Sequence, residues 1–169
     1  LTLVFMSLAT LAHGGHDAEH EHAYERPVQV DADLIDVVEK SLEYSRLSDG
    51  VFDVTYASVG YLFDYRKHVH PTDAQIAAAL PAVDYRQVVV DHDARTIRFL
   101  KPGMRIDLGG IAKGWAVDRG IDILRELGIE HAMVNAGGDT RLLGDRRGKP
   151  WIVGISDPRN EGKVVTRIP

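Results

Sequence analysis

Residues 107–118 read DLGGIAKGWAVD, and this stretch decides how the rest of the chain is interpreted. An extended run ends at the Asp107 carboxylate, and Gly109 and Gly110 then lead into a helical pattern whose first turn carries Lys113. Glycine can reach φ > 0 and lets the backbone approach a ligand closely, and N–H groups at a helix start favour an anion. The layout suits a nucleotide phosphate with a bridging cation, but a plain turn followed by a solvated lysine gives the same pattern.

Comparison with known phosphate-binding motifs, together with the composition, excludes several kinds of site and partner. Lys113 precedes Gly114 with no Ser or Thr after the pair, so the stretch is not a Walker A loop, and it lacks G-x-G-x-x-G spacing. The 169 residues predict one domain or a piece of one, with 44% apolar and 27% charged residues typical of globular proteins. A net charge of −5 argues against nucleic acid as a partner. The absence of cysteine excludes disulfides, thiolate metal sites and a cysteine nucleophile.

Outward from this stretch, periodicity predicts helices over residues 32–47 and 111–127. Asp31 or Asp33 is expected to cap the first helix, and Thr72 with Gln75 forms a capping box for a short helix that Pro81 ends. Extended segments are expected at residues 28–30, 87–90, 96–100, 104–108, 131–135, 140–143 and 151–156. Hairpins mixed with helices predict an α+β fold, with helices packed on a mixed or antiparallel sheet.

The buried helix faces also follow from the periodicity. In the first helix they comprise Leu34, Val37, Val38 and Leu42. In the second they comprise Val117, Ile121, Leu124 and Leu127, with Gly128 just beyond the helix end.

The N-terminal segment has a different composition. Residues 1–12, LTLVFMSLATLA, are apolar but too short to span a bilayer, and they fit either the core of a secretory signal or a short buried element. Polar residues 13–22 then carry His13, His16, His20 and His22 among carboxylates. Imidazole and carboxylate groups together predict either a weak site for Zn²⁺, Ni²⁺ or Cu²⁺, or a solvated polar tail.

Three stretches place acidic or amide side chains in apolar or glycine-rich surroundings: residues 107–113, introduced above, and residues 50–55 and 135–139. Each has a structural alternative to ligand binding. Asp53 fits a helix or turn cap, and Asn135 and Asp139 fit turn chemistry around two glycines.

Four ordered stretches resemble one known family: SRLSDGVFDVT (45–55), DLGGIAKGWAVD (107–118), VNAGGDTRLLG (134–144) and PWIVGISDPR (150–159). On these the chain is identified as similar to the ApbE family of FAD:protein FMN transferases, over residues 26–159. The resemblance implies a Mg²⁺-dependent transfer. A Thr or Ser hydroxyl of a target protein attacks the FMN-side phosphorus of FAD, AMP leaves, and the target becomes flavinylated.

The resemblance also implies site residues. Val51, Phe52, Asp53, Asp107 and Lys113 would contact FAD. Gly110 would give its backbone carbonyl to Mg²⁺, a hard cation that prefers oxygen ligands. No general base is implied. Family members act in the periplasm or at the outer face of the cytoplasmic membrane, and their partner is the flavin-accepting protein.

The match to the family pattern is partial. Residues 1–25 lie outside it, residues 26–169 form a partial ApbE-like flavin transferase domain, and further flavin contacts and metal ligands are expected beyond both ends. One carbonyl cannot hold Mg²⁺ against its hydration shell, so we expect little or no transferase activity from this chain alone, and poor stability from exposed core edges. Two alternatives remain: a non-catalytic flavin-binding fragment, and an exported metal-binding protein that uses the histidine-rich segment.

Overall fold

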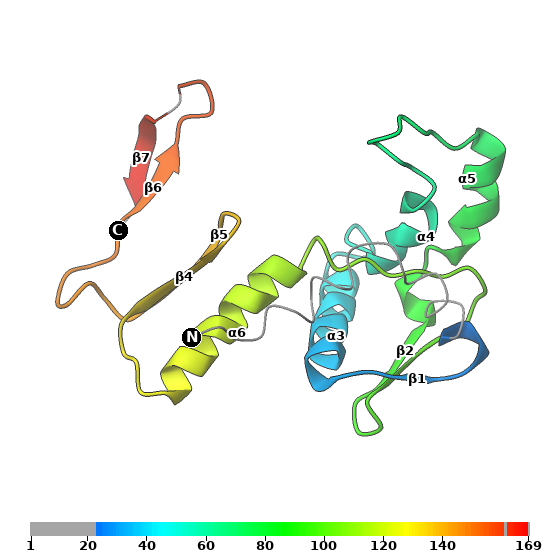
Figure 1. Cartoon of the computed structure of the whole chain (residues 1–169), viewed down its shortest axis with the longest axis horizontal. Helices are drawn as coiled ribbons and strands as arrows, with labels where there is room; N and C mark the ends of the chain where they lie inside the picture. Colours follow the sequence, from blue (N-terminus) through cyan, green and yellow to red (C-terminus); the bar gives the residue numbers. More distant parts are fainter. Residues whose placement is uncertain (1–22, 161, 169) are drawn as a thin grey trace. The chain divides into compact units, whose positions relative to one another are not determined.

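The computed structural model describes residues 23–160 and 162–168, so the apolar segment 1–12 and the four histidines of residues 13–22 lie outside it. The chain divides into a first unit, Leu1–Ala112, and a second unit, Lys113–Pro169 (Figure 1). The first contains β1 (Val28–Gln29), α3 (Ala32–Leu47), η1 (Val54–Tyr56), α4 (Ala57–Gly60), α5 (Asp73–Ala79), η2 (Leu80–Ala82), η3 (Tyr85–Gln87), β2 (Val88–Asp91) and β3 (Thr96–Phe99). The second contains α6 (Ala112–Glu126, starting at the boundary), β4 (Ala132–Ala136), β5 (Asp139–Leu143), β6 (Val153–Ser156) and β7 (Val164–Ile168).

Helix α3 is the main helix of the first unit, and the sequence predicted its bounds. Asp31 is the cap, because its carboxylate accepts a hydrogen bond from the Leu34 amide at 2.8 Å. Past the helix end, Gly50 adopts φ 80° and its amide donates to the Ser45 carbonyl at 2.8 Å. Of the predicted apolar face, Leu34 is partly buried and the other members are buried: Val37, Val38 and Leu42.

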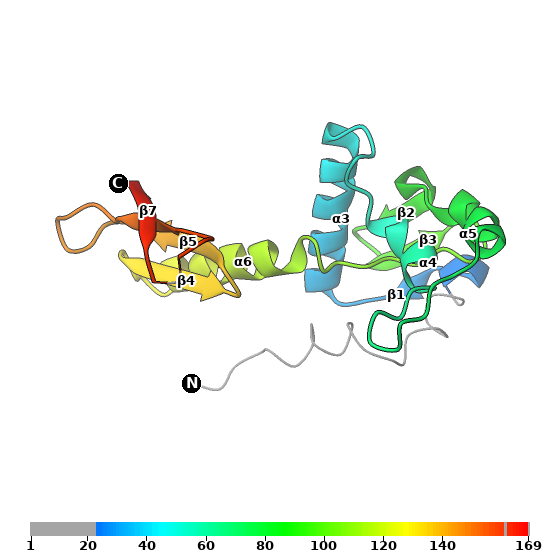
Figure 2. The ribbon, with the colours of Figure 1, turned by 90° about the horizontal axis from the view of Figure 1, so that it is seen from above.

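A three-stranded antiparallel sheet of order β1-β3-β2 packs against α3 (Figure 2). The predicted hairpin is confirmed, with Val88 opposite Phe99 and Asp91 opposite Thr96. Its turn is closed locally, since the Ala94 amide donates to the Asp91 carboxylate at 2.9 Å. Alternate strand residues face α3, and they complete one core that contains Ile35, Val38, Leu42, Val88, Ile97 and Phe99.

Helix α5 begins as the sequence predicted. Both halves of the capping box are present: the Thr72 hydroxyl accepts from the Gln75 amide, and the Gln75 side chain accepts from the Thr72 amide. The helix gives way to the short turn η2, which contains Pro81.

The strand predicted at residues 104–108 is wrong. This segment carries no strand pairing, although Met104 is fully buried. Its backbone is held by other partners: the Arg105 amide donates to the Ser58 hydroxyl at 3.0 Å, and the Asp107 amide donates to the Val54 carbonyl at 2.9 Å. An extended, half-apolar run therefore docks on the η1–α4 region rather than on a strand edge.

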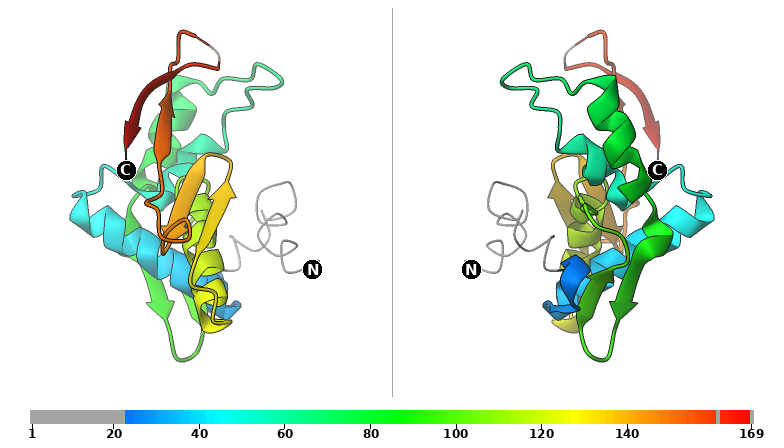
Figure 3. Two further views of the ribbon diagram at one scale, coloured as in Figure 1. Left: turned by 90° about the vertical axis from the view of Figure 1, so that its left-hand side faces the viewer. Right: turned by 90° about the vertical axis from the view of Figure 1, so that its right-hand side faces the viewer.

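The second unit pairs α6 with the β4–β5 hairpin, and a separate β6–β7 hairpin follows (Figure 3). Gly120 of α6 faces Val134, so close that a Cβ there would lie 3.3 Å from a Val134 methyl carbon. Of the predicted α6 face, Val117 and Ile121 are buried, whereas Leu127 is 72% exposed. The described residues of β6 and β7 are all exposed, and β7 was not predicted.

The described elements confirm the α+β class, and every strand pair among them is antiparallel. Within residues 23–160 and 162–168, no helix is long and apolar enough to cross a membrane.

Candidate functional site

The glycine turn, residues 107–111, is stabilised by the carboxylate of Asp107. Asp107 Oδ1 accepts a hydrogen bond from the Gly109 amide at 2.7 Å, and the Ile111 and Ala112 amides both donate to the Leu108 carbonyl. A Cβ at position 109 would lie only 2.9 Å from Asp107 Oδ1. Gly109 is therefore required because the carboxylate folds back over it, and its amide already has an anionic partner.

Gly110 serves a different purpose from Gly109. A Cβ at position 110 would lie 3.3 Å from Cε2 of Phe52, which shows how closely the glycine turn meets the Phe52 ring. Neither glycine adopts positive φ, so space rather than backbone conformation explains both. Two predicted site residues distant in sequence, Phe52 and Gly110, are thus neighbours, while Val51 is 92% exposed beside them.

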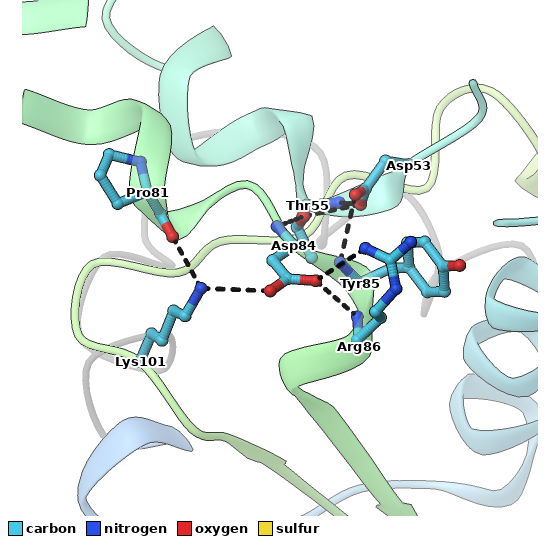
Figure 4. A network of polar contacts seen from close by, with 7 residues as sticks. All are labelled: Asp53, Thr55, Pro81, Asp84, Tyr85, Arg86 and Lys101. Atoms are coloured by element: carbon cyan, nitrogen blue, oxygen red, sulfur yellow. Dashed lines mark hydrogen bonds and ion pairs between the residues drawn. The ribbon is translucent and has the colours of Figure 1, made fainter. Parts of the chain in front are cut away.

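The Asp53 side chain caps η1 (Figure 4). This is the structural role that the sequence offered as an alternative to ligand binding. Oδ1 accepts from the Thr55 amide at 2.8 Å and from the Thr55 hydroxyl at 2.6 Å, and Oδ2 accepts from the Tyr85 amide at 3.1 Å. Thr55, fully buried, in turn accepts from the Asp84 amide at 2.8 Å. Both carboxylate oxygens of Asp53 are therefore engaged in holding the residue 53–55 loop to the residue 84–85 turn.

An ion-pair network lies on the outer side of this loop (Figure 4). Lys101 donates to the Asp84 carboxylate at 3.1 Å and to the Pro81 carbonyl at 3.2 Å. Burial opposes ionisation of Asp84, but hydrogen bonds from Lys101 and from the Arg86 amide hold the pKa of Asp84 below its usual range. This network could not be predicted from the sequence, because Pro81, Asp84 and Lys101 are brought together only by the fold.

Replacing Lys101 with methionine should lower the free energy of unfolding of the first unit by less than about 1 kcal/mol at neutral pH. A carboxyl whose folded-state pKa is lowered stabilises the fold above its unfolded-state pKa, and this stabilisation is lost as the pH falls through the folded-state value. The difference between wild type and variant should therefore vanish in acid. Urea unfolding followed by circular dichroism at neutral and acid pH measures this, with Lys163→Met in the second unit as control; a difference that persists in acid would contradict it.

Tyr56 contacts Asp107, and it was not among the site residues predicted from the sequence. Burial and then the Asp107 carboxylate, by charge and by a hydrogen bond, raise the pKa of the Tyr56 phenol. The residue is 51% exposed. The sequence indicated its place in the site only weakly, because Tyr56 directly follows the Asp53-Val54-Thr55 motif.

Lys113 belongs to the second unit, where it meets another predicted stretch. Its Nζ lies 3.8 Å from Asp139 Oδ2, and its side chain contacts the Gly137 position. Gly137 and Gly138 adopt φ 58° and 102° and form the turn between β4 and β5. Asn135 and Asp139 flank this turn in the two strands, and the Asn135 amide group donates to the Thr140 hydroxyl on the opposite strand. The structure therefore unites Lys113 with the carboxylate beside this turn.

The glycine turn contains oxygen atoms of the kind that a hard cation such as Mg²⁺ prefers as ligands. In the first unit the turn offers two oxygen donors, the Asp107 carboxylate and the Gly110 backbone carbonyl. Mg²⁺ takes about six oxygen ligands, so these two groups alone would not hold it, and water or other groups would have to complete its shell.

Comparison with known proteins assigns this chain to a protein family. The ApbE family model matches residues 17–169. A FAD:protein FMN transferase of Vibrio cholerae serotype O1 is 31% identical over 154 residues, which cover 88% of this chain and 46% of that protein. The chain spans about half the length of the curated relatives that it matches.

Solved structures agree with the sequence matches. The apbe protein from Thermotoga maritima superposes with a TM-score of 0.75 at 32% identity, covering 89% of this chain and 50% of that one. The flavin transferase ApbE from Vibrio cholerae gives 0.72 at 32% identity, covering 83% and 47%. Because the family model covers nearly all of the sequence, the chain belongs to the ApbE family.

Proposed function

We propose that this chain is part of an FAD:protein FMN transferase, which moves FMN from FAD to a Thr or Ser hydroxyl of a target protein and releases AMP. The observation that carries the proposal is the junction of two motifs: the Asp107 amide bonds the Val54 carbonyl, and Gly110 meets the Phe52 ring. Relatives about 31% identical carry the name FAD:protein FMN transferase.

Residues on both sides of this junction are proposed to bind FAD. Phe52 offers an aromatic surface for the flavin or adenine ring, with the exposed side chain of Val51 next to it. Asp53, whose carboxylate is engaged as a cap, would contribute through its main chain and by fixing the loop. The Asp107 carboxylate, which already accepts from the Gly109 amide and is hydrogen-bonded to the Tyr56 phenol, would add a contact to FAD.

Charge neutralisation is assigned to Lys113 and to Mg²⁺. The Lys113 ammonium is more than half exposed and only loosely paired with Asp139, so it can exchange that partner for a phosphate oxygen. The Gly110 carbonyl is proposed as one Mg²⁺ ligand, and the ion would neutralise the charge of the FAD diphosphate. The chain's own contribution is positioning, because a phosphoryl group must be held in line with the attacking hydroxyl.

Flavin titration of the 169-residue chain tests the binding role. Asp107→Ala and Lys113→Met should each weaken FAD binding at least about tenfold, as loss of a charged contact does. Lys149→Met, another exposed lysine in the second unit, is the matched control. Equal FAD affinity in wild type, Asp107→Ala and Lys113→Met would refute the assignment.

Transfer itself is expected to be weak in this chain. The glycine turn offers two candidate oxygen ligands where Mg²⁺ takes about six, and the chain spans about half the length of the curated relatives that it matches. An assay with FAD, Mg²⁺ and a Thr-containing target peptide should therefore show little or no labelling. Robust labelling would mean that the 169 residues already hold a complete site.

Enlarging Gly110 should disturb the site without unfolding the first unit. Gly110→Val adds atoms where a Cβ alone would already lie 3.3 Å from Phe52, so the ring must move. We expect FAD affinity to fall by at least about tenfold, which corresponds to about 1.4 kcal/mol. Gly114→Ala is the control, since a Cβ there meets nothing within 4 Å. Unchanged affinity in Gly110→Val would show that the junction is not the binding surface.

We also propose that the protein acts in the periplasm or at the outer face of the cytoplasmic membrane. The support is the family resemblance together with the apolar composition of residues 1–12. Cell fractionation of the native gene product tests it, and recovery only from the cytoplasm would contradict it.

A further inference from the structure

A second group of metal-ligating side chains lies on the surface of the first unit, apart from the glycine turn. It consists of Asp36 and Glu39 on α3 and His92 at the start of the β2–β3 turn. One ligand atom from each residue lies within 4.8 Å of the other two. His92 Nδ1 already lies 3.1 Å from Glu39 Oε2.

The geometry of this group fits a small divalent ion. Ligand atoms around tetrahedral Zn²⁺ lie roughly 3.3 Å apart, as follows from Zn–N and Zn–O distances of about 2 Å. The His92–Glu39 separation is already of this size, whereas the three ligand atoms together lie within 4.8 Å of one another, so the exposed Asp36 side chain would have to move closer when an ion binds. Asp36 and Glu39 are one helical turn apart on α3, so their spacing is fixed by the helix.

The electrostatics of the group also favour a cation. Its two carboxylates would carry two negative charges against one imidazole, and Asp93 lies nearby on the turn. The hydrogen bond to Glu39, and then the charges of Glu39, Asp36 and Asp93, raise the pKa of His92. Negative potential thus converges on the ring nitrogen, where a divalent ion would relieve the repulsion between the carboxylates.

We propose that Asp36, Glu39 and His92 form a binding site for a divalent transition-metal ion such as Zn²⁺, with three protein ligands and water completing the shell. One imidazole with two carboxylates is a ligand set that suits Zn²⁺ and its neighbours better than Mg²⁺. The bound ion would fasten the β2–β3 turn to α3, two elements that otherwise meet here through the His92–Glu39 pair.

Zn²⁺ titration of the full chain tests this site separately from the histidine-rich segment. The background is the chain with His13, His16, His20 and His22 all replaced by alanine, which removes that competing segment. In this background, His92→Ala should weaken Zn²⁺ binding by at least about tenfold, and Glu39→Gln should do the same without changing side-chain size. Matched controls are His70→Ala and Glu43→Gln, which remove an imidazole and an α3 carboxylate outside the group.

Thermal unfolding with and without Zn²⁺ separates metal binding from a purely structural ion pair. A site that binds only the folded state raises the melting temperature when Zn²⁺ is added, and this rise should be absent in His92→Ala and Glu39→Gln. Co²⁺ in place of Zn²⁺ should give a visible absorption band that the same variants lose. If Zn²⁺ affinity is unchanged in both variants, or if they lower the melting temperature equally with and without Zn²⁺, the proposal is overturned.

Discussion

Replacing Asp53 with alanine is expected to lower the free energy of unfolding of the first unit by about 3 kcal/mol. The substitution removes the acceptor of three hydrogen bonds, from the Thr55 amide, the Thr55 hydroxyl and the Tyr85 amide. Thr55 is fully buried, so water cannot replace the lost acceptor. The loop that carries Phe52 should loosen at the same time, which would weaken FAD binding as well.

The matched variants separate the cap from the charge. Asp53→Asn keeps one acceptor oxygen and should cost less than half as much as Asp53→Ala. Trp115 and Trp151 both lie in the second unit, so tryptophan fluorescence reports on that unit while hydrogen exchange of α3 reports on the first. Equal α3 protection in wild type and Asp53→Ala would contradict the capping role.

Replacing Phe99 with alanine should lower the free energy of unfolding of the first unit by about 4 kcal/mol. Phe99 is 2% exposed and belongs to the core between the sheet and α3. Removing its ring leaves a cavity that surrounding side chains such as Ile35 and Val38 can fill only in part. Urea unfolding measured by hydrogen exchange of α3 gives the value.

Leu100 provides the control, because it is the next residue and is 48% exposed. Leu100→Ala should change stability by well under about 1 kcal/mol. If Phe99→Ala and Leu100→Ala have similar effects, the core assignment is wrong.

Elements with local signals were predictable from the sequence. The Asp31 cap, the Thr72–Gln75 capping box and the β2–β3 hairpin each depend on residues within a few positions of one another. Segment 104–108 was misassigned because its backbone partners, Ser58 and Val54, lie about fifty positions earlier, beyond what a periodic pattern contains.

In the candidate site, too, some features were predictable from the sequence and others depend on contacts between distant residues. The family resemblance selected Phe52 and Gly110, and the fold brings them together. The capping role of Asp53 was one of the two interpretations of the sequence, whereas the bond to the Tyr85 amide was not expected, since it spans 32 positions. The His92 group gave no signal either, because its ligands come from two segments that only packing brings together.

If the glycine turn and the Phe52 loop bind FAD, as we propose, titration of the isotopically labelled chain with FAD and Mg²⁺ should change its NMR spectrum at these residues. We expect saturable shifts of the amide resonances of Phe52, Asp53, Gly109, Gly110 and Lys113. Unchanged resonances at these positions, or shifts confined to other parts of the chain, would contradict the proposal.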